Sequence, residues 1–222
     1  MTLELRAVTY SYAGTRRRAI EDIELTIADG EIVGLTGPNE SGKTTTCLVA
    51  SGFAPASIGG ELTGEVLLDG ERLAVNAPWE LAGRTGLLLD VAHRTGMTGT
   101  VLEEIAFGPV NLGLEVEDTL ARAHWAMGAL GIDDLSGRAP ANLSGGQQRL
   151  VAIAGILAMA PRILVLDEPL GELDTDARAR LAAALRTFAA AGNSILIAEH
   201  DHEFLAAFPA RIITIRNGRI DA

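Results

Sequence analysis

Hydrophobic and polar residues alternate over residues 3–8 and again over residues 23–27, with the period of two that is typical of half-buried strands. Turn-forming residues 13–15 lie between the two segments, which predicts that they are neighbouring strands of an antiparallel sheet. Another strand is predicted over residues 64–70, which ends in an Asp-Gly pair of the kind that closes hairpins. The amino-terminal part of the chain is therefore expected to form a half-exposed antiparallel sheet.

A second pattern, in which short apolar runs alternate with helical periodicity, begins at residue 32 and returns after residue 150. Buried strands are expected where the apolar runs are continuous, and helices where apolar residues recur every three or four positions. This alternation is typical of an α/β fold. The strands are predicted over residues 32–36, 86–89, 163–166, 194–198 and 212–215, and the helices over residues 43–51 and 177–190.

Residues 91–150 differ from both patterns, because they have few strand signals and several segments of helical periodicity. Here and just beyond, helices are predicted over residues 101–107, 119–130 and 146–159. We therefore expect one domain, with an α/β core and an antiparallel β flank made from residues 1–90 and 151–222. The helical segment between these parts is expected to form an inserted lobe.

Composition and charge restrict the classes of function. The chain has 222 residues, of which 48% are hydrophobic, so it can bury a sizeable core. Its net charge of −11 disfavours a surface that neutralises the phosphates of DNA or RNA, and no nucleic-acid partner is expected. The strongest basic cluster, residues 16–18, is interpreted as a solvated loop. Cys47 is the only cysteine, which excludes an intrachain disulfide and indicates a reducing compartment.

No segment of the sequence is expected to enter a membrane. Glu4 and Arg6 interrupt the amino terminus before the apolar core of a signal peptide is formed. The longest apolar stretch, residues 150–161, is shorter than the roughly 20 residues that a helix needs to span a bilayer. If the chain serves a membrane process, the membrane-spanning part is therefore expected to be another polypeptide.

The candidate nucleotide site begins with residues 37–44, which read Gly-Pro-Asn-Glu-Ser-Gly-Lys-Thr. This segment follows a predicted buried strand and opens a predicted helix, so its backbone N–H groups can turn inward around a phosphate. Lys43 is expected to place its ammonium on the β- and γ-phosphates, and Thr44 to offer its hydroxyl to Mg²⁺. The residues of this segment that are expected to bind ATP are Gly37, Asn39, Glu40, Ser41, Gly42, Lys43, Thr44 and Thr45.

Two further motifs follow this loop. Residues 143–149 read Leu-Ser-Gly-Gly-Gln-Gln-Arg, and residues 163–169 read Ile-Leu-Val-Leu-Asp-Glu-Pro. In this order, the three motifs resemble the nucleotide-binding domain of ABC ATPases, and the resemblance extends over nearly the whole chain. It implies a P-loop NTPase (RecA-like) core with an antiparallel β flank and an inserted α-helical subdomain. It also implies Mg²⁺-dependent hydrolysis of ATP to ADP and phosphate.

The resemblance implies that the second of these motifs is hydrolytic. Asp167 ends an apolar strand and is expected to bind Mg²⁺, either directly or through water, together with Thr44. Glu168 resembles the family's general base, which orients and deprotonates the attacking water. Loss of Glu168 is therefore expected to trap ATP without preventing its binding.

Two residues outside the motifs also match positions that the family uses. His200 follows the strand predicted over residues 194–198 and resembles the family's switch histidine, which touches the γ-phosphate. Tyr12 stands where the family places an aromatic residue that stacks on adenine. His93 and His202 lack such support and are interpreted as surface or packing residues.

The signature segment at the start of a predicted helix comprises Ser144, Gly145, Gly146 and Gln147. The length of that helix holds its anion-attracting amino terminus far from the catalytic carboxylates of the same chain. We therefore expect the signature segment to act on ATP bound by a second subunit, either another copy or a related chain. Asp174 resembles the residue that communicates between the two sites of a dimer, and it can also cap the helix that begins near residue 175.

Two residues depart from the family's pattern. Glu40 occupies a position where most relatives have glycine, and a carboxylate beside a polyphosphate is unfavourable unless it points away. Weaker or slower handling of nucleotide is therefore expected. Asp90 occupies the position of a glutamine that links the Mg²⁺ site to the membrane partner. It is retained as a candidate Mg²⁺ ligand, although the coupling is expected to be weakened or retuned.

Residues 101–114 are similar to a segment of the ATPase subunits of energy-coupling factor transporters, which import vitamins and cobalt or nickel. The resemblance implies a cytoplasmic ATPase subunit, bound to the inner face of the cell membrane through a separate transmembrane subunit. Two alternatives are a soluble ABC ATPase that remodels a protein assembly and a regulatory nucleotide-binding module with slow hydrolysis.

Overall fold

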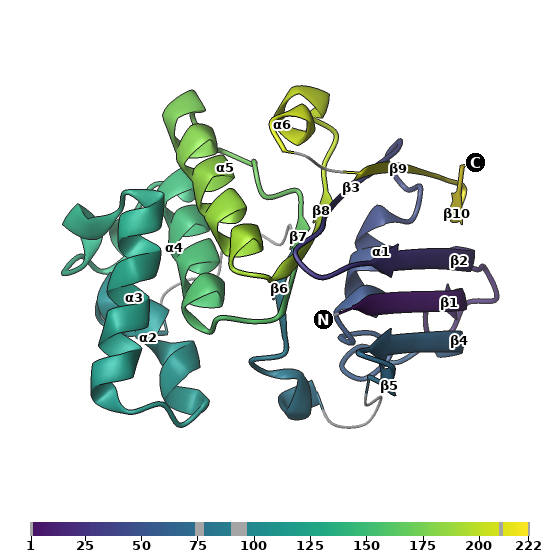
Figure 1. Ribbon diagram of the computed structural model, residues 1–222, viewed down its shortest axis with the longest axis horizontal. Helices are drawn as coiled ribbons and strands as arrows, with labels where there is room; N and C mark the ends of the chain where they lie inside the picture. Colours follow the sequence, from purple (N-terminus) through teal and green to yellow (C-terminus); the bar gives the residue numbers. More distant parts are fainter. Residues whose placement is uncertain (1, 74–77, 90–96, 209–210, 222) are drawn as a thin grey trace.

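The computed structural model of the chain describes residues 2–73, 78–89, 97–208 and 211–221, and it contains two sheets surrounded by helices. Figure 1 shows the antiparallel sheet on one side of the molecule, most helices on the other side, and the second sheet between them. The predicted α/β class with an antiparallel flank is confirmed.

The antiparallel sheet contains β1 (Leu3–Ser11), β2 (Ile20–Ile27), β4 (Glu61–Leu68) and β5 (Glu71–Arg72) in the order β2-β1-β4-β5. The period of two that predicted these strands turns one face inward, where β1 buries Leu3, Leu5, Val8 and Tyr10. Asp69 and Gly70 close the β4–β5 hairpin as predicted, and their φ angles of 54° and 77° fit a tight hairpin turn.

Strand β1 is longer than its sequence pattern predicted. Its pairing with β2 shifts register between Leu5 and Val8, and Ala7 between them has a positive φ of 49°. Such a bulge inserts a residue, so the alternation of buried and exposed positions stops although the strand continues to Ser11. The prediction therefore ended at residue 8, whereas the strand continues through Tyr10, and Tyr12 directly follows its last residue.

The second sheet has the strand order β10-β9-β3-β8-β7-β6, and its strands run parallel except β10 at the edge. All residues of β3, β7 and β8 are buried, which accounts for the continuous apolar runs in the sequence. The strands are β3 (Ile32–Thr36), β6 (Thr85–Leu88), β7 (Ile163–Asp167), β8 (Ser194–Ala198), β9 (Arg211–Arg216) and β10 (Arg219–Ile220).

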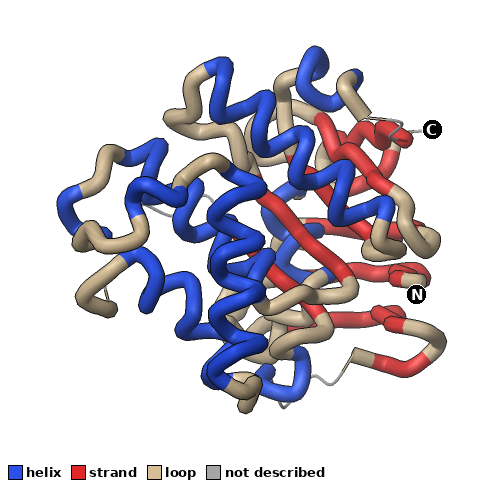
Figure 2. Tube along the Cα trace, turned by 60° about the vertical axis from the view of Figure 1, so that its left-hand side comes forward, coloured by secondary structure: helices blue, strands red, loops and turns tan. Residues whose placement is uncertain are grey.

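Helix α1 packs between the two sheets, whereas α4 and α5 contact the second sheet and α2 and α3 pack against α4. Figure 2 shows the helices gathered beside the strands. The α-helices are α1 (Lys43–Ala50), α2 (Val101–Asn111), α3 (Val116–Leu130), α4 (Gly145–Ala158), α5 (Thr175–Ala190) and α6 (His202–Ala206). Three 3₁₀ segments span Pro78–Leu81, Asp133–Leu135 and Pro140–Asn142.

Two described helices extend three or more residues beyond their predicted bounds, and α6 was not predicted. Helix α2 continues to Asn111 through Pro109, and α3 begins at Val116, three residues before its clear periodicity. Helix α6 has five residues, which is too short to show a helical period in the sequence. Among the described residues, no helix combines the length and hydrophobicity that crossing a bilayer requires.

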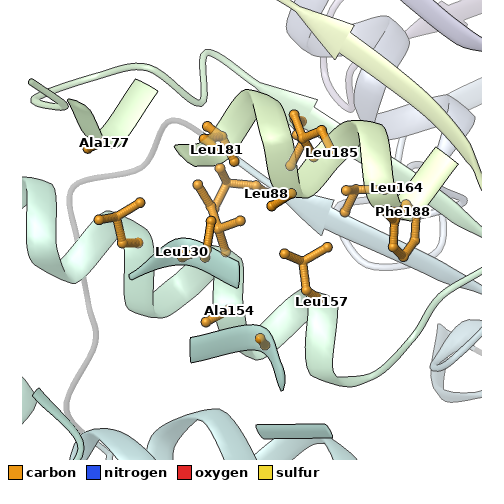
Figure 3. Close-up of a cluster of buried hydrophobic side chains, with 14 of the residues drawn as sticks. Leu88, Leu130, Ala154, Leu157, Leu164, Ala177, Leu181, Leu185 and Phe188 are labelled. Atoms are coloured by element: carbon orange, nitrogen blue, oxygen red, sulfur yellow. The ribbon is translucent and has the colours of Figure 1, made fainter. Parts of the chain in front are cut away.

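The second sheet separates two hydrophobic clusters, and successive residues of its central strands point into different clusters. In β7, Leu164 and Leu166 pack into the cluster beneath α2, α3, α4 and α5, whereas Ile163 and Val165 face α1 and the antiparallel sheet. Figure 3 shows the first cluster, in which Leu164 lies with side chains from α3, α4 and α5. Burial on both faces holds the carboxyl end of β7 in place, and this end carries Asp167.

Candidate functional site

A hollow of about 730 Å³ lies beside the loop that connects β3 to α1. It is lined by residues that come from the β1–β2 connection, from this loop and from the segments after β7 and β9. The carboxyl ends of parallel strands meet at one edge of a sheet, which is where α/β folds place their ligands. The lining residues are Tyr12, Thr15, Arg17, Arg18, Ala19, Asn39, Glu40, Ser41, Gly42, Lys43, Thr44, Thr45, Glu168, Asn217 and Gly218.

The loop requires glycine at two positions. Gly37 has a φ of 145°, and a Cβ atom there would lie 2.1 Å from the carbonyl oxygen of Ile215. Gly42, directly before α1, has a φ of 111°, and a Cβ atom there would lie 3.0 Å from the carbonyl oxygen of Ala19. Any side chain would therefore displace the backbone of β9 or of the β1–β2 connection. The loop keeps its shape because neighbouring strands approach it closely.

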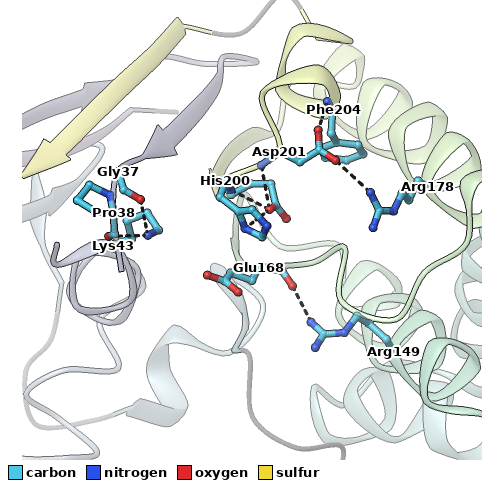
Figure 4. A network of polar contacts seen from close by, with 10 residues as sticks. Gly37, Pro38, Lys43, Arg149, Glu168, Arg178, His200, Asp201 and Phe204 are labelled. Carbon is cyan, nitrogen blue, oxygen red and sulfur yellow. Dashed lines mark hydrogen bonds and ion pairs between the residues drawn. The ribbon is translucent and has the colours of Figure 1, made fainter. Parts of the chain in front are cut away.

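Lys43 is the first residue of α1 and the only lysine of the chain. Its side chain is mostly buried, and Nζ donates hydrogen bonds to the carbonyl oxygens of Gly37 (2.9 Å) and Pro38 (3.1 Å). Figure 4 shows this ammonium enclosed by the loop. A cation in a ring of backbone groups at a helix amino terminus is suited to bind the phosphates of a nucleotide.

Glu40 stands where the family resemblance implies glycine, and the structure shows how the loop accommodates it. Its φ of 61° lies in the left-handed region, which costs an L-residue about 1 kcal/mol relative to glycine. Its side chain is exposed and lines the hollow, so its carboxylate contributes negative charge beside the candidate phosphate site. Glycine would remove both the backbone strain and this charge.

Tyr12 lies at the other end of the hollow. Its hydroxyl lies 3.0 Å from Oγ1 of Thr45, and its ring contacts that of Tyr10 edge to face, with centroids 5.1 Å apart. Tyr10 is fully buried, and burial is the main cause that raises the pKa of its hydroxyl. Of these two tyrosines, only Tyr12 lines the hollow and is available to stack on a base.

Asp167 and Glu168 end β7 on the same side of the sheet. Asp167 is buried, whereas Glu168 is half-buried and lines the hollow. The backbone of Glu168 is tied at both ends, because its N–H donates to the carbonyl of Ala198 at 2.9 Å and its carbonyl accepts from Nη1 of Arg149 at 2.8 Å (Figure 4). Glu168, the predicted general base, therefore lies at the hollow beside the β3–α1 loop.

The oxygen donors of this region suit a hard divalent cation. Thr44 presents an exposed hydroxyl in the hollow, and Asp167 provides a carboxylate at the end of β7. Mg²⁺ bound with a nucleotide takes few protein ligands and completes its shell with phosphates and water. In the described ranges, no cluster of three or more His, Cys, Asp or Glu residues is suited to hold a metal. Asp90, the third candidate ligand, and His93 lie outside the described residues.

Cys47 in α1 is fully buried. Burial and, secondarily, the negative charge of Asp167 raise the pKa of the thiol well above its ordinary value. The thiol is therefore protonated and unreactive.

His200 follows β8, the strand beside β7, and most of its imidazole is exposed. Its Nδ1 lies 3.0 Å from Oε1 of Glu199, which is almost completely buried. His202, interpreted as a surface or packing residue, is exposed at the start of α6. The carboxyl ends of two neighbouring strands thus carry Glu168 and His200.

The signature segment lies elsewhere, at the amino terminus of α4. Ser144 caps this helix, because its hydroxyl accepts from the N–H of Gln147 and its own N–H donates to the Gln147 side chain. Ser144, Gly146, Gln147 and Asp174 line a second hollow of about 300 Å³. Among the described residues, none of the signature residues lines the first hollow.

Close packing requires glycine at one position of the signature segment. A Cβ atom on Gly146 would lie 2.5 Å from the backbone carbonyl oxygen of Glu172, whereas one on Gly145 would meet only the flexible side chain of Glu172. Asp174 caps α5, since its Oδ1 accepts from the N–H of Ala177 at 2.8 Å. The capping interpretation of Asp174 is therefore confirmed, and its role in a dimer stays a prediction.

Several residues of the site were not identified from the sequence. Arg17 and Arg18 were interpreted as part of a solvated loop, and they are exposed. They also line the hollow beside the β3–α1 loop, because they belong to the β1–β2 connection. Arg149 contacts the backbone of Glu168, although the two residues are far apart in the sequence. Glu199 had a usable signal, because it is a charged residue directly after an apolar strand and before His200.

Comparison with known proteins shows the family to which the chain belongs. The sequence pattern of the family described as ABC transporter matches residues 20–171. The chain is 38% identical to the cobalt import ATP-binding protein CbiO of Rhodobacter capsulatus, covering 98% of this chain and 76% of that protein. It is 35% identical to the energy-coupling factor transporter ATP-binding protein EcfA of Methanothermobacter thermautotrophicus, covering 99% and 70%.

A solved structure has the same fold. CbiO1 of Clostridium perfringens, described as part of the ABC transporter complex CbiONQ, superimposes with a TM-score of 0.84 at 26% sequence identity. The match covers 99% of this chain and 86% of that protein.

Proposed function

This chain belongs to the ABC transporter family, and on that premise we propose that it is the ATP-hydrolysing subunit of an energy-coupling factor or cobalt-type importer. The observation that carries the proposal is that the phosphate loop and Glu168 line one hollow, in a chain whose relatives are importer subunits. In this proposal, closure of a dimer around ATP drives a conformational change in a membrane partner.

ATP would bind with its triphosphate on the loop and its base against Tyr12. The N–H groups between Gly37 and Thr45 and the ammonium of Lys43 would hold the phosphates. The proposal is supported by the hollow, which extends from Lys43 to Tyr12. Adenine can stack on the exposed part of the tyrosine ring.

Replacing Tyr12 with alanine is expected to weaken ATP binding by about 1–3 kcal/mol, because the base loses its stacking surface. Affinities would be measured by calorimetry for ATP and for inorganic tripolyphosphate, which has no base. Only the ATP affinity is expected to fall. Tyr12→Phe is the control, since it keeps the ring and removes only the hydroxyl near Thr45. Equal losses for ATP and tripolyphosphate would contradict the stacking role.

For hydrolysis, the oxygen atoms of Thr44 and Asp167 would hold Mg²⁺. When bound, the ion would neutralise part of the negative charge of the phosphates and so lower the barrier to attack by water. Glu168 would accept a proton from the attacking water, and its backbone contacts with Arg149 and Ala198 hold it at the rim of the hollow. His200 would contact the γ-phosphate from the end of β8. Asp90 remains a proposed contributor to the Mg²⁺ site.

A second subunit is needed to complete each site. Helix α4 has 14 residues, about 21 Å at 1.5 Å per residue, and its signature end lines a different hollow from the phosphate loop. We propose that Ser144 and the following residues close over ATP bound by a partner, and that Asp174 lies at the junction of the two sites. The partner is a second copy or a related chain.

The chain would work beside the membrane. The described helices include none that could span a bilayer, and the relatives are named as subunits of transporters. We propose that a separate transmembrane subunit recruits the chain to the cytoplasmic face of the cell membrane.

Glu40→Gly is expected to tighten ATP binding several-fold, because it removes a carboxylate near the phosphates and relieves the left-handed backbone. Glu40→Gln is the matched variant, since it removes the charge and leaves the backbone strain. Calorimetry with ATP separates the two contributions. An affinity of Glu40→Gly that is no tighter than that of the parent would exclude this role of Glu40.

Glu40 also favours an alternative function, that of a regulatory nucleotide-binding module that hydrolyses ATP slowly. The importer subunit and the regulatory module differ in the expected rate of steady-state phosphate release by the parent relative to Glu168→Gln. A parent rate no higher than that of the variant would favour the regulatory function.

The importer proposal is tested by affinity purification of Glu168→Gln from detergent-solubilised membranes of its host, with ATP and Mg²⁺. Recovery of a polytopic membrane protein with a small, very hydrophobic companion would support it. Recovery of soluble proteins alone would favour the alternative of a protein-remodelling ATPase.

A further inference from the structure

Glu199 is a buried carboxylate for which the proposed reaction has no role. It directly follows β8 and is 1% exposed, and its N–H donates to the carbonyl of Leu35 at 3.0 Å. Since β8 lies between β3 and β7, Glu199 is held among the carboxyl ends of the strands that form the nucleotide site. Burying a carboxylate costs free energy unless the carboxylate is paired. The partners of Glu199 therefore indicate the role of its side chain.

One oxygen of this carboxylate makes all of its described contacts. Oε1 accepts from the N–H of His200 (2.8 Å) and the N–H of Asp201 (3.2 Å), and it lies 3.0 Å from Nδ1 of the His200 ring. In the described part of the chain, Oε2 is buried and has no hydrogen-bond partner. A carboxylate that serves only to stabilise the fold is expected to have both of its oxygens hydrogen-bonded. The arrangement of Glu199 therefore favours a role other than stabilising the fold.

The contact with the ring favours one tautomer of the imidazole. At 3.0 Å, Nδ1 and Oε1 form an ion pair when the ring is protonated, and in the neutral ring a proton on Nδ1 is attracted by the carboxylate, whereas a lone pair there is repelled by it. The partner of one ring nitrogen influences the orientation and the tautomer of an imidazole. Nε2 then lies on the side of the ring away from Glu199, and the His200 side chain is 75% exposed.

We propose that Glu199 is the positioning residue of His200, whose buried carboxylate holds the imidazole by Nδ1 and presents Nε2 to the γ-phosphate of ATP. The proposal rests on the proposed function, in which His200 contacts that phosphate. Glu199 lines neither of the two hollows, and it acts through the ring that it orients.

Two variants separate the charge of Glu199 from its shape. Glu199→Met has a similar volume and no acceptor, whereas Glu199→Gln keeps an oxygen for the N–H groups of His200 and Asp201. Loss of the carboxylate contact with the His200 ring is expected to reduce kcat of Glu199→Met by about tenfold or more, with KM for ATP within about twofold. Glu199→Gln is expected to lose less, because a neutral acceptor makes a weaker bond. Glu203→Gln, an exposed carboxylate in α6, is the matched control and is expected to keep the parent rate.

A double-mutant cycle tests whether Glu199 acts through the ring. In a His200→Gln background, Glu199→Met is expected to change kcat by less than about twofold, since the group that it positions is absent. An equal loss in both backgrounds would assign Glu199 a general structural role and overturn the proposal. An unchanged kcat of Glu199→Met in the parent background would also overturn it.

The tautomer gives a readout that does not depend on hydrolysis. In the ¹⁵N-histidine NMR spectrum of the parent at alkaline pH, the His200 ring, assigned with His200→Gln, is expected to carry its proton on Nδ1. In Glu199→Met this proton is expected to move largely to Nε2. A parent ring protonated on Nε2 would overturn the proposal. Because the spectrum is recorded without ATP, it still tests the contact if the parent has no ATPase activity and the proposed function fails.

Discussion

Replacing Glu168 with glutamine is expected to slow ATP hydrolysis by a factor of about 10² to 10⁴ without weakening ATP binding. The amide keeps the shape of the side chain and cannot take a proton from water. The backbone contacts of Glu168 with Arg149 and Ala198 do not involve the side chain, so the loop after β7 is expected to stay in place. Binding groups on the phosphate loop are unchanged, and bound ATP is therefore retained.

Phosphate release, nucleotide content and sedimentation in the presence of ATP and Mg²⁺ measure these effects. The variant is expected to retain ATP and to sediment as a dimer, because the step that reopens the dimer is blocked. Glu117→Gln, which removes an exposed carboxylate in the first turn of α3, is the control for the loss of one charge. Hydrolysis at the parent rate by Glu168→Gln would exclude Glu168 as the general base.

Replacing Lys43 with methionine is expected to weaken ATP binding about 100-fold or more, because two charge-assisted contacts with phosphates are lost. Methionine has a comparable apolar stem and no ammonium, which suits the buried position at the start of α1. The variant also loses the hydrogen bonds to Gly37 and Pro38 that hold the loop around the ammonium. Lys43→Arg keeps the charge and tests whether the compact ammonium is required.

Calorimetry with ATP measures the loss, and thermal unfolding without nucleotide controls for folding. The parent chain allows an independent test, because Lys43 is its only lysine. An acylating reagent followed by mass spectrometry reports modification of Lys43 separately from the terminal amine, and ATP is expected to protect it. Binding of ATP by Lys43→Met with the affinity of the parent would exclude the proposed phosphate contact.

Two arginines connect the nucleotide site to the elements around it. Arg149 lies on α4, whose amino terminus carries the signature segment, and it holds the carbonyl of Glu168. Arg178 on α5 donates to the carbonyl of Leu173 and forms an ion pair with Asp201 at 3.0 Å (Figure 4). Direct hydrogen bonds therefore join α4 to Glu168 and α5 to Asp201, the residue after His200.

Much of the fold was predictable, because the hydrophobic pattern of the sequence agrees with the burial of residues in the structure. The all-apolar segments at residues 163–166 and 194–198 became fully buried strands, and Asp69 with Gly70 became a hairpin turn. The misses have local causes. The bulge at Ala7 interrupted the alternation in β1, and α6 is too short to show a period.

The sequence by itself determined the family, the order of the motifs and the chemical type of each candidate residue, because these depend on residue identity and spacing. Glycines, Lys43 and the Asp167–Glu168 pair carry this information in short segments. Only the tertiary structure decided which of them meet. It placed Glu168 and Tyr12 on the hollow of the phosphate loop and the signature segment on another hollow. It also buried Glu199 against the ring of His200 and brought Arg149 to Glu168, since such contacts depend on how sheets and helices pack and leave no periodic signal along the chain.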